Sequence, residues 1–503
     1  MLNRLNILFP LIAACLLSLS VPVNAEDERP THKFSRQWLD DRAKELASQE
    51  YVEQKLPADS PLNNLNYDDY RKIQFQRSAT IWKNEDRNFR LSPMHPGFLF
   101  KTPVKLNLVV GGISRRILYT SEIFNYDEEQ QAAKESEAPG YSGFKLTTPI
   151  NKPGIWDEFL VYQGGTYFRA LGKDNWYGLS ARGLAVNTAK PSGEEFPVFS
   201  EFWIERPKEQ SDTLVIHALL ESPSLTGAFT FIATPGDKTV IEVKSTLYPR
   251  RNISSFGIAP LTSMYLFNDL NRNRFDDFRP AVHDSDGLFM LNSQNEKIWR
   301  PLANPRKLQV SVFQDESFKG FGLFQRHREF RDFDDIEAHY EDRPSAWVEP
   351  IGKWGPGHVE LVEIPTNSEI HDNIVAFWQP AEPLKAQKPY SFHYKISWSS
   401  LFAVEDKGGR IVSSASGRTL GNENSRDYVI DYTATDLPDD LVVNAIASTG
   451  KITGVIQKFI PNTGLYRVVV KFEPDNQDIS ELRVSLSTKD KPWGETWLYR
   501  WSR

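Results

Sequence analysis

The chain has 503 residues, of which 40% are hydrophobic and 12% aromatic, so it has enough apolar material for at least two folded domains and is not a disordered protein. Its formal net charge of −7 at pH 7 excludes a strongly basic surface, so we expect no nucleic-acid partner. The single cysteine, Cys15, lies in the N-terminal apolar run, so no disulfide framework is expected.

Residues 1–25 have the pattern of a secretory signal peptide. Arg4 is followed by an apolar run and then by "VPVNA", whose small residues suit cleavage after Ala25. "LIAAC" loosely resembles a lipoprotein box that would make Cys15 a lipid anchor, but the apolar run continues past it. No twin-arginine pair precedes the run, which favours Sec-type export of the unfolded chain.

After this segment the pattern predicts one helix and then strands. Residues 34–51 place Leu39, Ala43 and Leu46 on one helical face. Stretches rich in β-branched and aromatic residues predict strands. They lie at 104–110, 213–221, 228–234, 238–248 and 389–398. In 389–398, strict alternation places five apolar side chains on one face, so that face is expected to be buried.

A change of composition divides the chain near residue 400. Residues 405–427 are polar and rich in glycine and serine, and we expect a linker there. Six short strand patterns follow, which suggests a small immunoglobulin-like sandwich. The expected domains are a large β-sandwich at 26–398 and an immunoglobulin-like domain with its linker at 399–503.

The familiar cofactor and metal motifs are absent. No HExxH, CxxC, GxGxxG, P-loop or GxSxG occurs, so we expect no cofactor and no metal centre. "DLNRNRFDD", from Asp269 to Asp277, approaches the spacing of a calcium loop. Arg274 stands where such a loop needs glycine and Pro280 where it needs glutamate, so a solvated, turn-rich loop is the better interpretation.

Two aspartates stand next to apolar runs. Asp284 lies in "HDSDG", in which Asp286 and Gly287 are ordinary turn formers, and Asp372 precedes "NIVAFW". Between and around them, residues 332–380 interleave acids with tryptophans, a mixture suited to a saccharide site because aromatic faces stack on sugar rings. From spacing alone, a simple turn and an exposed aspartate remain the commoner explanations.

The sequence closely resembles the periplasmic glucan biosynthesis protein G and D family. The resemblance rests on blocks that run through essentially the whole mature chain. They are "LNYDDYRKIQF", "HPGFLF", "EFLVYQGGTYFRALG", "YGLSARGLA", "HDSDGL", "RPSAWVEP", "DNIVAFW" and "ETWLYRW". The absence of a twin-arginine pair makes the chain more similar to the G branch.

The resemblance implies a mainly β fold, in which a large N-terminal β-sandwich of the galactose-mutarotase type precedes the small C-terminal immunoglobulin-like β-sandwich. It also implies similarity to endo-acting β-1,2-glucanases that invert the anomeric centre. On the matching motifs, Asp372 is the general acid, Asp284 the general base, and Tyr340 assists proton transfer. Inversion needs the two carboxyls roughly 6.5 to 9.5 Å apart. We expect burial near Trp378 to raise the pKa of Asp372, and a wetter setting to keep Asp284 ionised.

Composition and family blocks together suggest four glucan-contacting residues. They are Arg343, Trp347, Glu349 and Trp354. The leading hypothesis is a periplasmic protein that binds β-1,2-linked glucan and hydrolyses it. One alternative is a non-catalytic scaffold that presents glucan to membrane-bound synthesis machinery, although retention of the trio Asp284, Tyr340 and Asp372 favours catalysis. Another is a branching transglycosylase that uses a sugar hydroxyl in place of water.

Overall fold

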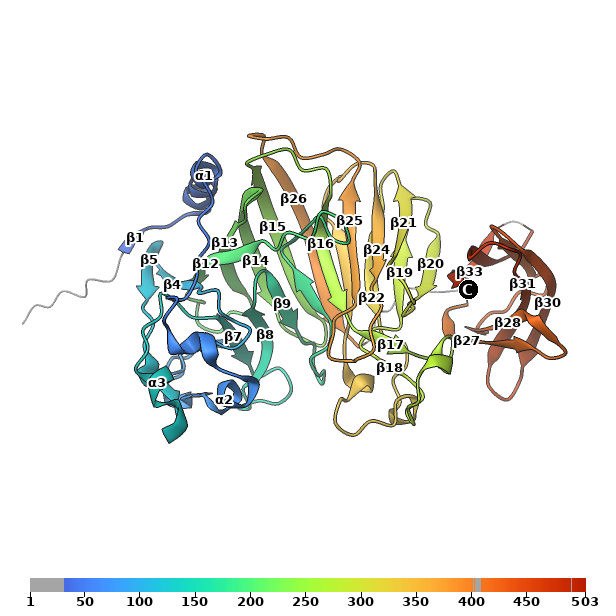
Figure 1. Cartoon of the computed structure of the whole chain (residues 1–503), viewed down its shortest axis with the longest axis horizontal. Helices are drawn as coiled ribbons and strands as arrows, with labels where there is room; N and C mark the ends of the chain where they lie inside the picture. The colour runs from blue at the N-terminus through green and yellow to red at the C-terminus, as the bar shows by residue number, and fades with distance from the viewer. Residues whose placement is uncertain (1–30, 401, 403–408, 490) are drawn as a thin grey trace, which may run out of the picture.

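The structure is a computed structural model that describes residues 31–400, 402, 409–489 and 491–503 (Figure 1). The expected signal peptide and Cys15 lie outside the described residues. The described chain is built mainly from strands, as the sequence predicts. Within it, no helix has the length and apolar character needed to cross a membrane.

The largest sheet has fifteen strands and extends through the whole molecule. Twelve of them belong to the N-terminal part and pair in the order β1-β5-β4-β12-β13-β14-β15-β26-β23-β22-β19-β20. Their bounds are β1 Thr31–Lys33, β5 Ile113–Ile117, β4 Lys105–Val110, β12 Val198–Glu205, β13 Leu214–Glu221, β14 Leu225–Thr234, β15 Thr239–Pro249, β26 Tyr390–Ser399, β23 Ser345–Pro350, β22 Gly320–Phe324, β19 Gly287–Leu291 and β20 Lys297–Pro301.

A ten-stranded sheet packs against this part. Its strands pair in the order β21-β24-β25-β16-β10-β9-β8-β7-β3, and β11 also pairs with β16. Their bounds are β21 Gln309–Asp315, β24 Gly357–Glu363, β25 Ile374–Pro380, β16 Phe256–Ser263, β10 Ser180–Arg182, β9 Tyr167–Ala170, β8 Asp157–Gln163, β7 Gly143–Thr148, β3 Arg90–Met94 and β11 Leu184–Val186. Two small ladders accompany it: β17 Tyr265–Phe267 with β18 Val282–His283, and β2 Gln74–Phe75 with β6 Phe124–Asn125.

The main hydrophobic core lies between the two sheets. Phe231 and Ile396 reach it from the fifteen-stranded sheet, and Phe168 and Trp378 reach it from the ten-stranded sheet. The alternation predicted in residues 389–398 is confirmed, because the alternate residues of β26 join this core. Residues between them point to the outer faces of the two sheets.

The helices are α1 Arg36–Ala47, α2 Tyr67–Lys72 and α3 Gln131–Lys134. The predicted helix is α1. The hydroxyl of Ser35 caps it by accepting a hydrogen bond from the amide of Trp38 (3.1 Å). Leu39 and Ala43 are buried against Trp203 of the fifteen-stranded sheet.

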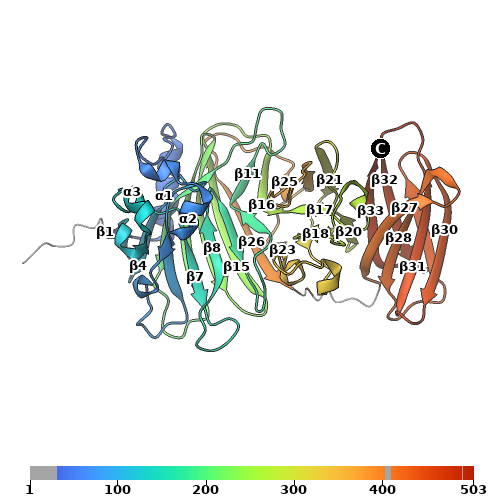
Figure 2. The same cartoon turned by 60° about the horizontal axis from the view of Figure 1, so that its bottom comes forward.

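The C-terminal part is a smaller sandwich at the other end of the molecule (Figures 1 and 2). One layer has the order β27-β28-β31-β30, and the other is β33-β32-β29, which continues the fifteen-stranded sheet. The bounds are β27 Ile411–Thr419, β28 Asn422–Thr433, β29 Val442–Ala447, β30 Lys451–Ile460, β31 Leu465–Glu473, β32 Ile479–Ser487 and β33 Pro492–Ser502. The expected mainly β fold, with a large and a small sandwich, is thus confirmed.

The expected linker at 405–427 is largely wrong. Residues 411–419 and 422–433 form the hairpin β27–β28, whose turn contains Gly421 at φ +78°. β27 lies at the edge of its layer and is partly exposed along most of its length, so it needs no hydrophobic alternation. Its serine-rich sequence therefore has no recognisable strand pattern. Residues 403–408 lie outside the described chain.

The two sandwiches are joined through strand pairing as well as side chains. β33 pairs in parallel with β20 at Ile298–Thr496 and Trp299–Trp497. Beside this contact, Arg326 forms a bidentate ion pair with Glu495, with both N···O distances at 2.7 Å. The exact boundary between the two domains stays a prediction, because one sheet runs through both.

Candidate functional site

Asp284 lies in the turn between β18 and β19, where the chain passes towards the fifteen-stranded sheet. Its amide donates to the carbonyl of Met264 (2.9 Å), and the amide of Asp286 donates to the carbonyl of Phe324 (2.7 Å). Both aspartates are buried, and Asp284 is 4% exposed. Main-chain hydrogen bonds on both sides therefore give the turn a single well-defined position.

The glycine of "HDSDG" has a packing role in this turn. Gly287 begins β19 directly against the indole of Trp299. A Cβ atom at Gly287 would lie 2.3 Å from that ring, which is closer than carbon atoms can approach. Replacing the glycine would therefore displace either Trp299 or the turn that carries Asp284.

Asp372 directly precedes Asn373 and strand β25, and its side chain is 32% exposed. Arg169 of β9 lies beside it, with Nη2 3.7 Å from Oδ2. Asn373 is buried and bonded to strand β17: its Oδ1 accepts from the amide of Tyr265 (2.8 Å), and its Nδ2 donates to the Tyr265 carbonyl (3.0 Å). Because β17 pairs with β18, this bridge connects the segments that carry the two acids.

The charge of Asp372 acts on Asp284, and Arg169 and Arg343 act on both acids. Burial raises the pKa of Asp284, the guanidinium of Arg343 opposes this, and the charge of Asp372 raises the pKa further. Burial also raises the pKa of Asp372, against the opposing effects of Arg169 and Arg343. The structure therefore brings the two predicted acids into one electrostatically coupled group, which is a feature typical of functional sites.

The predicted residues Arg343 and Tyr340 belong to this group. Nη1 of Arg343 is bonded to Oδ1 of Asp284, and the guanidinium lies over the ring of Tyr340 at 4.4 Å. The hydroxyl of Tyr340 donates to Glu369 Oε2 (3.2 Å) and forms no hydrogen bond to Asp284. Burial raises the pKa of Tyr340 above the usual value of a tyrosine. The phenol is therefore neutral and can donate a hydrogen bond.

The expected contrast between a dry acid and a wet base is wrong. Asp284 is the more buried carboxyl, whereas Asp372 retains about a third of its side-chain exposure. Trp378 lies in the core between the sheets and stacks on Phe318. The charge of Asp284 is stabilised by Arg343 and not by solvent. The sequence does not reveal this contact, because 59 positions separate the two residues.

Three of the four predicted glucan-contacting residues do not belong to the group around Asp284 and Asp372. Trp347 and Glu349 are on the outer face of β23, since the alternate residues Ala346 and Val348 face the core. Trp347 packs on Phe289 and Phe324 in the cluster between the two sandwiches.

Trp354 packs against the main core, where its Nε1 donates to the carbonyl of His393 (3.1 Å). The structure does not bring Trp347, Glu349 or Trp354 into contact with the two acids.

Sequence reasoning missed residues on the outer face of the ten-stranded sheet. In β9, Phe168 and Ala170 face the core, so Tyr167 and Arg169 face outward towards Asp372. The charge of Asp372 contributes to raising the pKa of Tyr167, after burial, which is the larger cause. Alternation in "TYFRA" was a usable signal, but only the order of strands in the ten-stranded sheet, β25-β16-β10-β9, shows that this face lies near Asp372.

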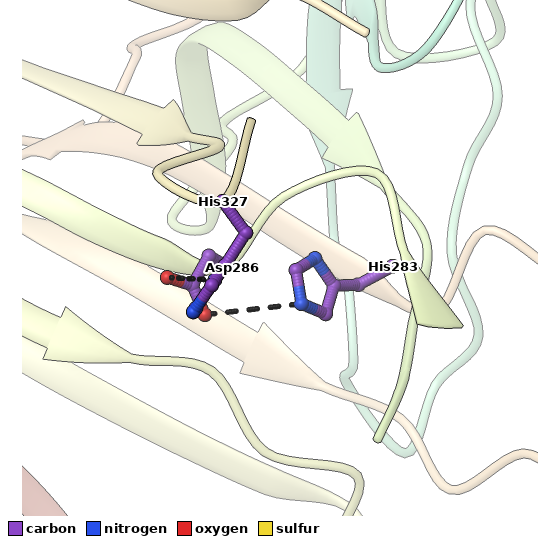
Figure 3. A group of neighbouring side chains, drawn as sticks. All are labelled: His283, Asp286 and His327. Atoms are coloured by element: carbon purple, nitrogen blue, oxygen red, sulfur yellow. Dashed lines mark ion pairs between the residues drawn. The ribbon is translucent and has the colours of Figure 1, made fainter. Parts of the chain in front are cut away.

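His283, Asp286 and His327 form a buried cluster behind the turn (Figure 3). Asp286 Oδ2 lies 3.3 Å from His327 Nδ1, and Asp286 Oδ1 lies 3.9 Å from His283 Nε2. Burial alone would raise the pKa of Asp286 and lower that of His327, but their mutual attraction outweighs burial. It sets the pKa of Asp286 to about 2 and that of His327 to about 9.

The spacing of these three side chains would suit a divalent transition metal. A metal ligand must be neutral histidine, however, whereas His327 is protonated at neutral pH by its pairing with Asp286. A metal ion at this cluster would therefore have to displace the proton of His327. Asp286 also accepts a hydrogen bond from Asn268 (2.9 Å), which ties the turn to the β17–β18 loop.

Two of the residues that could supply oxygen ligands to the possible calcium loop, Asp277 and Asn271, are bonded to protein groups. Asp277 forms an ion pair with Arg279 at 2.8 Å. Asn271 Oδ1 accepts from the hydroxyl of Tyr265 (3.2 Å) and from the amide of Asn268 (3.3 Å). These contacts favour the turn-rich loop over the calcium site.

The fold and this group of side chains define a two-sandwich β protein with a coupled pair of carboxyls flanked by arginines. The chain belongs to the periplasmic glucan biosynthesis family, since the model described as "Periplasmic glucan biosynthesis protein, MdoG" matches residues 34–501. The family's name assigns its members to the periplasm and to glucan biosynthesis.

Relatives support the same assignment. Glucans biosynthesis protein G of Vibrio cholerae serotype O1 is 43% identical over 504 residues, which covers 96% of this chain and 92% of the relative. The protein of the same name from Shewanella baltica is 46% identical and covers 92% of this chain and 86% of its own.

Among solved structures, a galactose mutarotase related enzyme from Lactobacillus acidophilus is 10% identical. The match covers 52% of this chain and 95% of that enzyme with a TM-score of 0.23, which is too low to support an argument.

Proposed function

We propose that this protein binds β-1,2-linked glucan in the periplasm and trims it by inverting endo-hydrolysis during glucan biosynthesis. The observation that carries the proposal is the coupled pair Asp284 and Asp372, each with a raised pKa and each beside an arginine. A binding protein does not need two such carboxyls, whereas inverting hydrolysis needs one protonated and one ionised carboxyl.

The surroundings of the two acids suggest their roles. Asp372 is partly exposed and has only Arg169 at 3.7 Å, so its raised pKa favours the protonated form that a general acid requires. Burial raises the pKa of Asp284 as well, but Arg343 is bonded directly to this carboxyl and opposes the rise, which favours the ionised form that a general base requires. Asp372 would protonate the leaving glycosidic oxygen, while Asp284 would accept a proton from the attacking water.

Tyr340 and Arg343 would support the base. Arg343 is held by the carbonyl of Ala338, to which Nη2 donates (2.9 Å), and by the ring of Tyr340. For Tyr340 to relay a proton towards Asp284, its hydroxyl would exchange Glu369 for the water or the sugar. We include Arg343 among the glucan-contacting residues and exclude Trp347 and Trp354, because their neighbours are core or interdomain side chains. We also exclude Glu349, which is exposed on the same outer face of β23 as Trp347.

An exposed aromatic residue near this group is a better candidate for stacking on sugar. Trp176 is 52% exposed and stacks on His339 at 4.1 Å, and His339 directly precedes Tyr340. His339 has the left-handed conformation (φ 48°), a strained conformation of the kind that gathers at functional sites. We propose Trp176 as a sugar platform at the edge of the site.

The test is incubation of the mature protein with linear β-1,2-glucan, following product size and anomeric form by NMR. Asp284→Asn and Asp372→Asn are compared with Asp59→Asn, an exposed aspartate far from the site. We expect shorter, inverted products from the parent and from Asp59→Asn, and at least a hundredfold less from the other two. Circular dichroism checks that the buried Asp284 variant is folded.

A non-catalytic scaffold is the second candidate, in which the protein presents glucan to membrane-bound synthesis machinery. Intact polymer in every preparation, bound equally well by all variants, would support it over hydrolysis. Products longer than the starting glucan would instead indicate a transglycosylase. Export by cleavage after Ala25 is part of the proposal, and N-terminal sequencing of the periplasmic protein tests it.

A further inference from the structure

A cavity of about 590 Å³ lies at the junction of the two sandwiches, away from the acid pair. On one side it is lined by the loop between β17 and β18 and by the segment between β20 and β21. On the other side it is lined by β27, β28 and the ends of β31 and β33. Neither Asp284 nor Asp372 contributes to it.

The cavity lining is cationic. Six arginines line it: Arg274, Arg306, Arg418, Arg426, Arg500 and Arg503. The opposing charges in the lining are the side chains of Glu423, Glu473 and Asp475. Since the whole chain has a formal net charge of −7, this local excess of positive charge is opposite to the overall balance.

Most of these arginines lack an internal carboxylate partner. Arg500 pairs with Glu481 (2.5 Å) and Arg503 with Asp478 (3.6 Å). The other four form no ion pair with the carboxylates of the described residues. Arg274 donates to the carbonyl of Asn304 and Arg426 to the hydroxyl of Ser416 (3.0 Å).

The remaining two arginines, Arg306 and Arg418, are exposed at the cavity. Burial lowers the pKa of Arg274, and the neighbouring charge of Arg306 lowers it further. Two positive charges, Arg306 of the segment between β20 and β21 and Arg274 of the β17–β18 loop, therefore repel one another. An anion between them would offset this repulsion.

We propose that this cavity binds a phosphate group, either free or carried on a larger polar ligand. Guanidinium groups donate paired hydrogen bonds to phosphate oxygens, and a phosphate offers enough acceptors for several arginines at once, whereas a carboxylate satisfies about one. Tyr428, Tyr499 and Trp501 also line the cavity but are buried, so the arginines are the groups that would bind the ligand. The proposal does not depend on glucan cleavage.

Isothermal titration of the full mature protein with inorganic phosphate and with glucose 6-phosphate tests this proposal. Glucose is the neutral control, and sodium chloride holds the ionic strength constant. The test variant is Arg306→Gln with Arg418→Gln, two exposed arginines whose loss should leave the fold intact. The matched control is Arg71→Gln with Arg77→Gln, which removes the same charge from the exposed N-terminal region.

We expect phosphate binding by the parent and by the control, no binding of glucose, and binding at least tenfold weaker in the test variant. Tighter binding of glucose 6-phosphate than of inorganic phosphate would assign the site to a carried phosphate, and equal binding to the free anion. No phosphate binding by the parent, or the same affinity in the test variant, would overturn the proposal. An equal loss of phosphate affinity in the control variant would also overturn it, because that result would indicate a general effect of net charge.

Discussion

The side chain of Asn373 forms two hydrogen bonds with the main chain of Tyr265, as a neighbouring strand would, at 2.8 and 3.0 Å. Asn373 also donates to the carbonyl of Ile364 (3.0 Å) and is 2% exposed. Since Asn373 follows Asp372, and Tyr265 lies on the strand that pairs with His283 beside Asp284, one buried amide holds the two acid-bearing segments together.

Replacing Asn373 with Ala should separate these segments and leave main-chain groups of Tyr265 unpaired. Each unsatisfied buried group costs about 1–3 kcal/mol, so we expect a loss of about 2–4 kcal/mol in the free energy of unfolding, measured with urea. Asn63→Ala is the control, because Asn63 is partly exposed and its side chain donates to a loop carbonyl through a solvent-exposed hydrogen bond. Equal losses in the two variants would contradict this special role for Asn373.

The Asp286–His327 ion pair should make stability depend on pH. The pKa of His327 is raised from 6.5 to about 9, so its contribution is complete below pH 6.5 and is lost as pH rises towards 9. We expect the free energy of unfolding to fall by about 2–3 kcal/mol over that range. In His327→Gln this decline should be absent, whereas His371→Gln, which changes an exposed histidine, should retain it. A parallel decline in all three proteins would exclude the ion pair as its cause.

Trp347 and Trp176 should respond to substitution in opposite ways. Trp347 packs between the sandwiches, so Trp347→Ala should lower the free energy of unfolding by about 2 kcal/mol or more and leave glucan affinity largely unchanged. Trp176 is half exposed, so Trp176→Ala should leave stability nearly unchanged and weaken glucan binding several-fold. Thermal melting and glucan titration of both variants test this, and the reverse pattern would restore Trp347 as a glucan contact.

Removing Arg169 should change the pH profile of glucan cleavage if Asp372 is the general acid. Arg169 opposes the rise in the pKa of Asp372, so this pKa is higher in Arg169→Gln. A general acid loses activity as it deprotonates, and therefore the alkaline limb of kcat/KM should move to higher pH. Arg77→Gln, remote from the site, should leave the limb in place. A shift to lower pH would argue that Asp372 is not the acid.

The local sequence contains enough information for the strands and for the choice of the two aspartates. The patterns at 213–221, 228–234 and 238–248 correspond to β13, β14 and β15, because alternation and β-branched residues are local properties. The sequence did not predict the β27–β28 hairpin, because an exposed edge strand needs no apolar alternation. The family blocks drew attention to Asp284 and Asp372, whose catalytic roles stay a prediction. The block with Trp347 looked equally suited to sugar, although Trp347 packs between the two sandwiches.

The sequence by itself determined the mainly β fold and the family and singled out the two candidate acids, because these depend on short patterns of residue type. The tertiary structure alone decided which side chains surround the acids. Arg169, Arg343 and Asn373 come from three separated parts of the chain and meet only when the two sheets pack and β17 pairs with β18. Contacts between distant segments set the burial and charge of Asp284 and Asp372, and no local pattern records them.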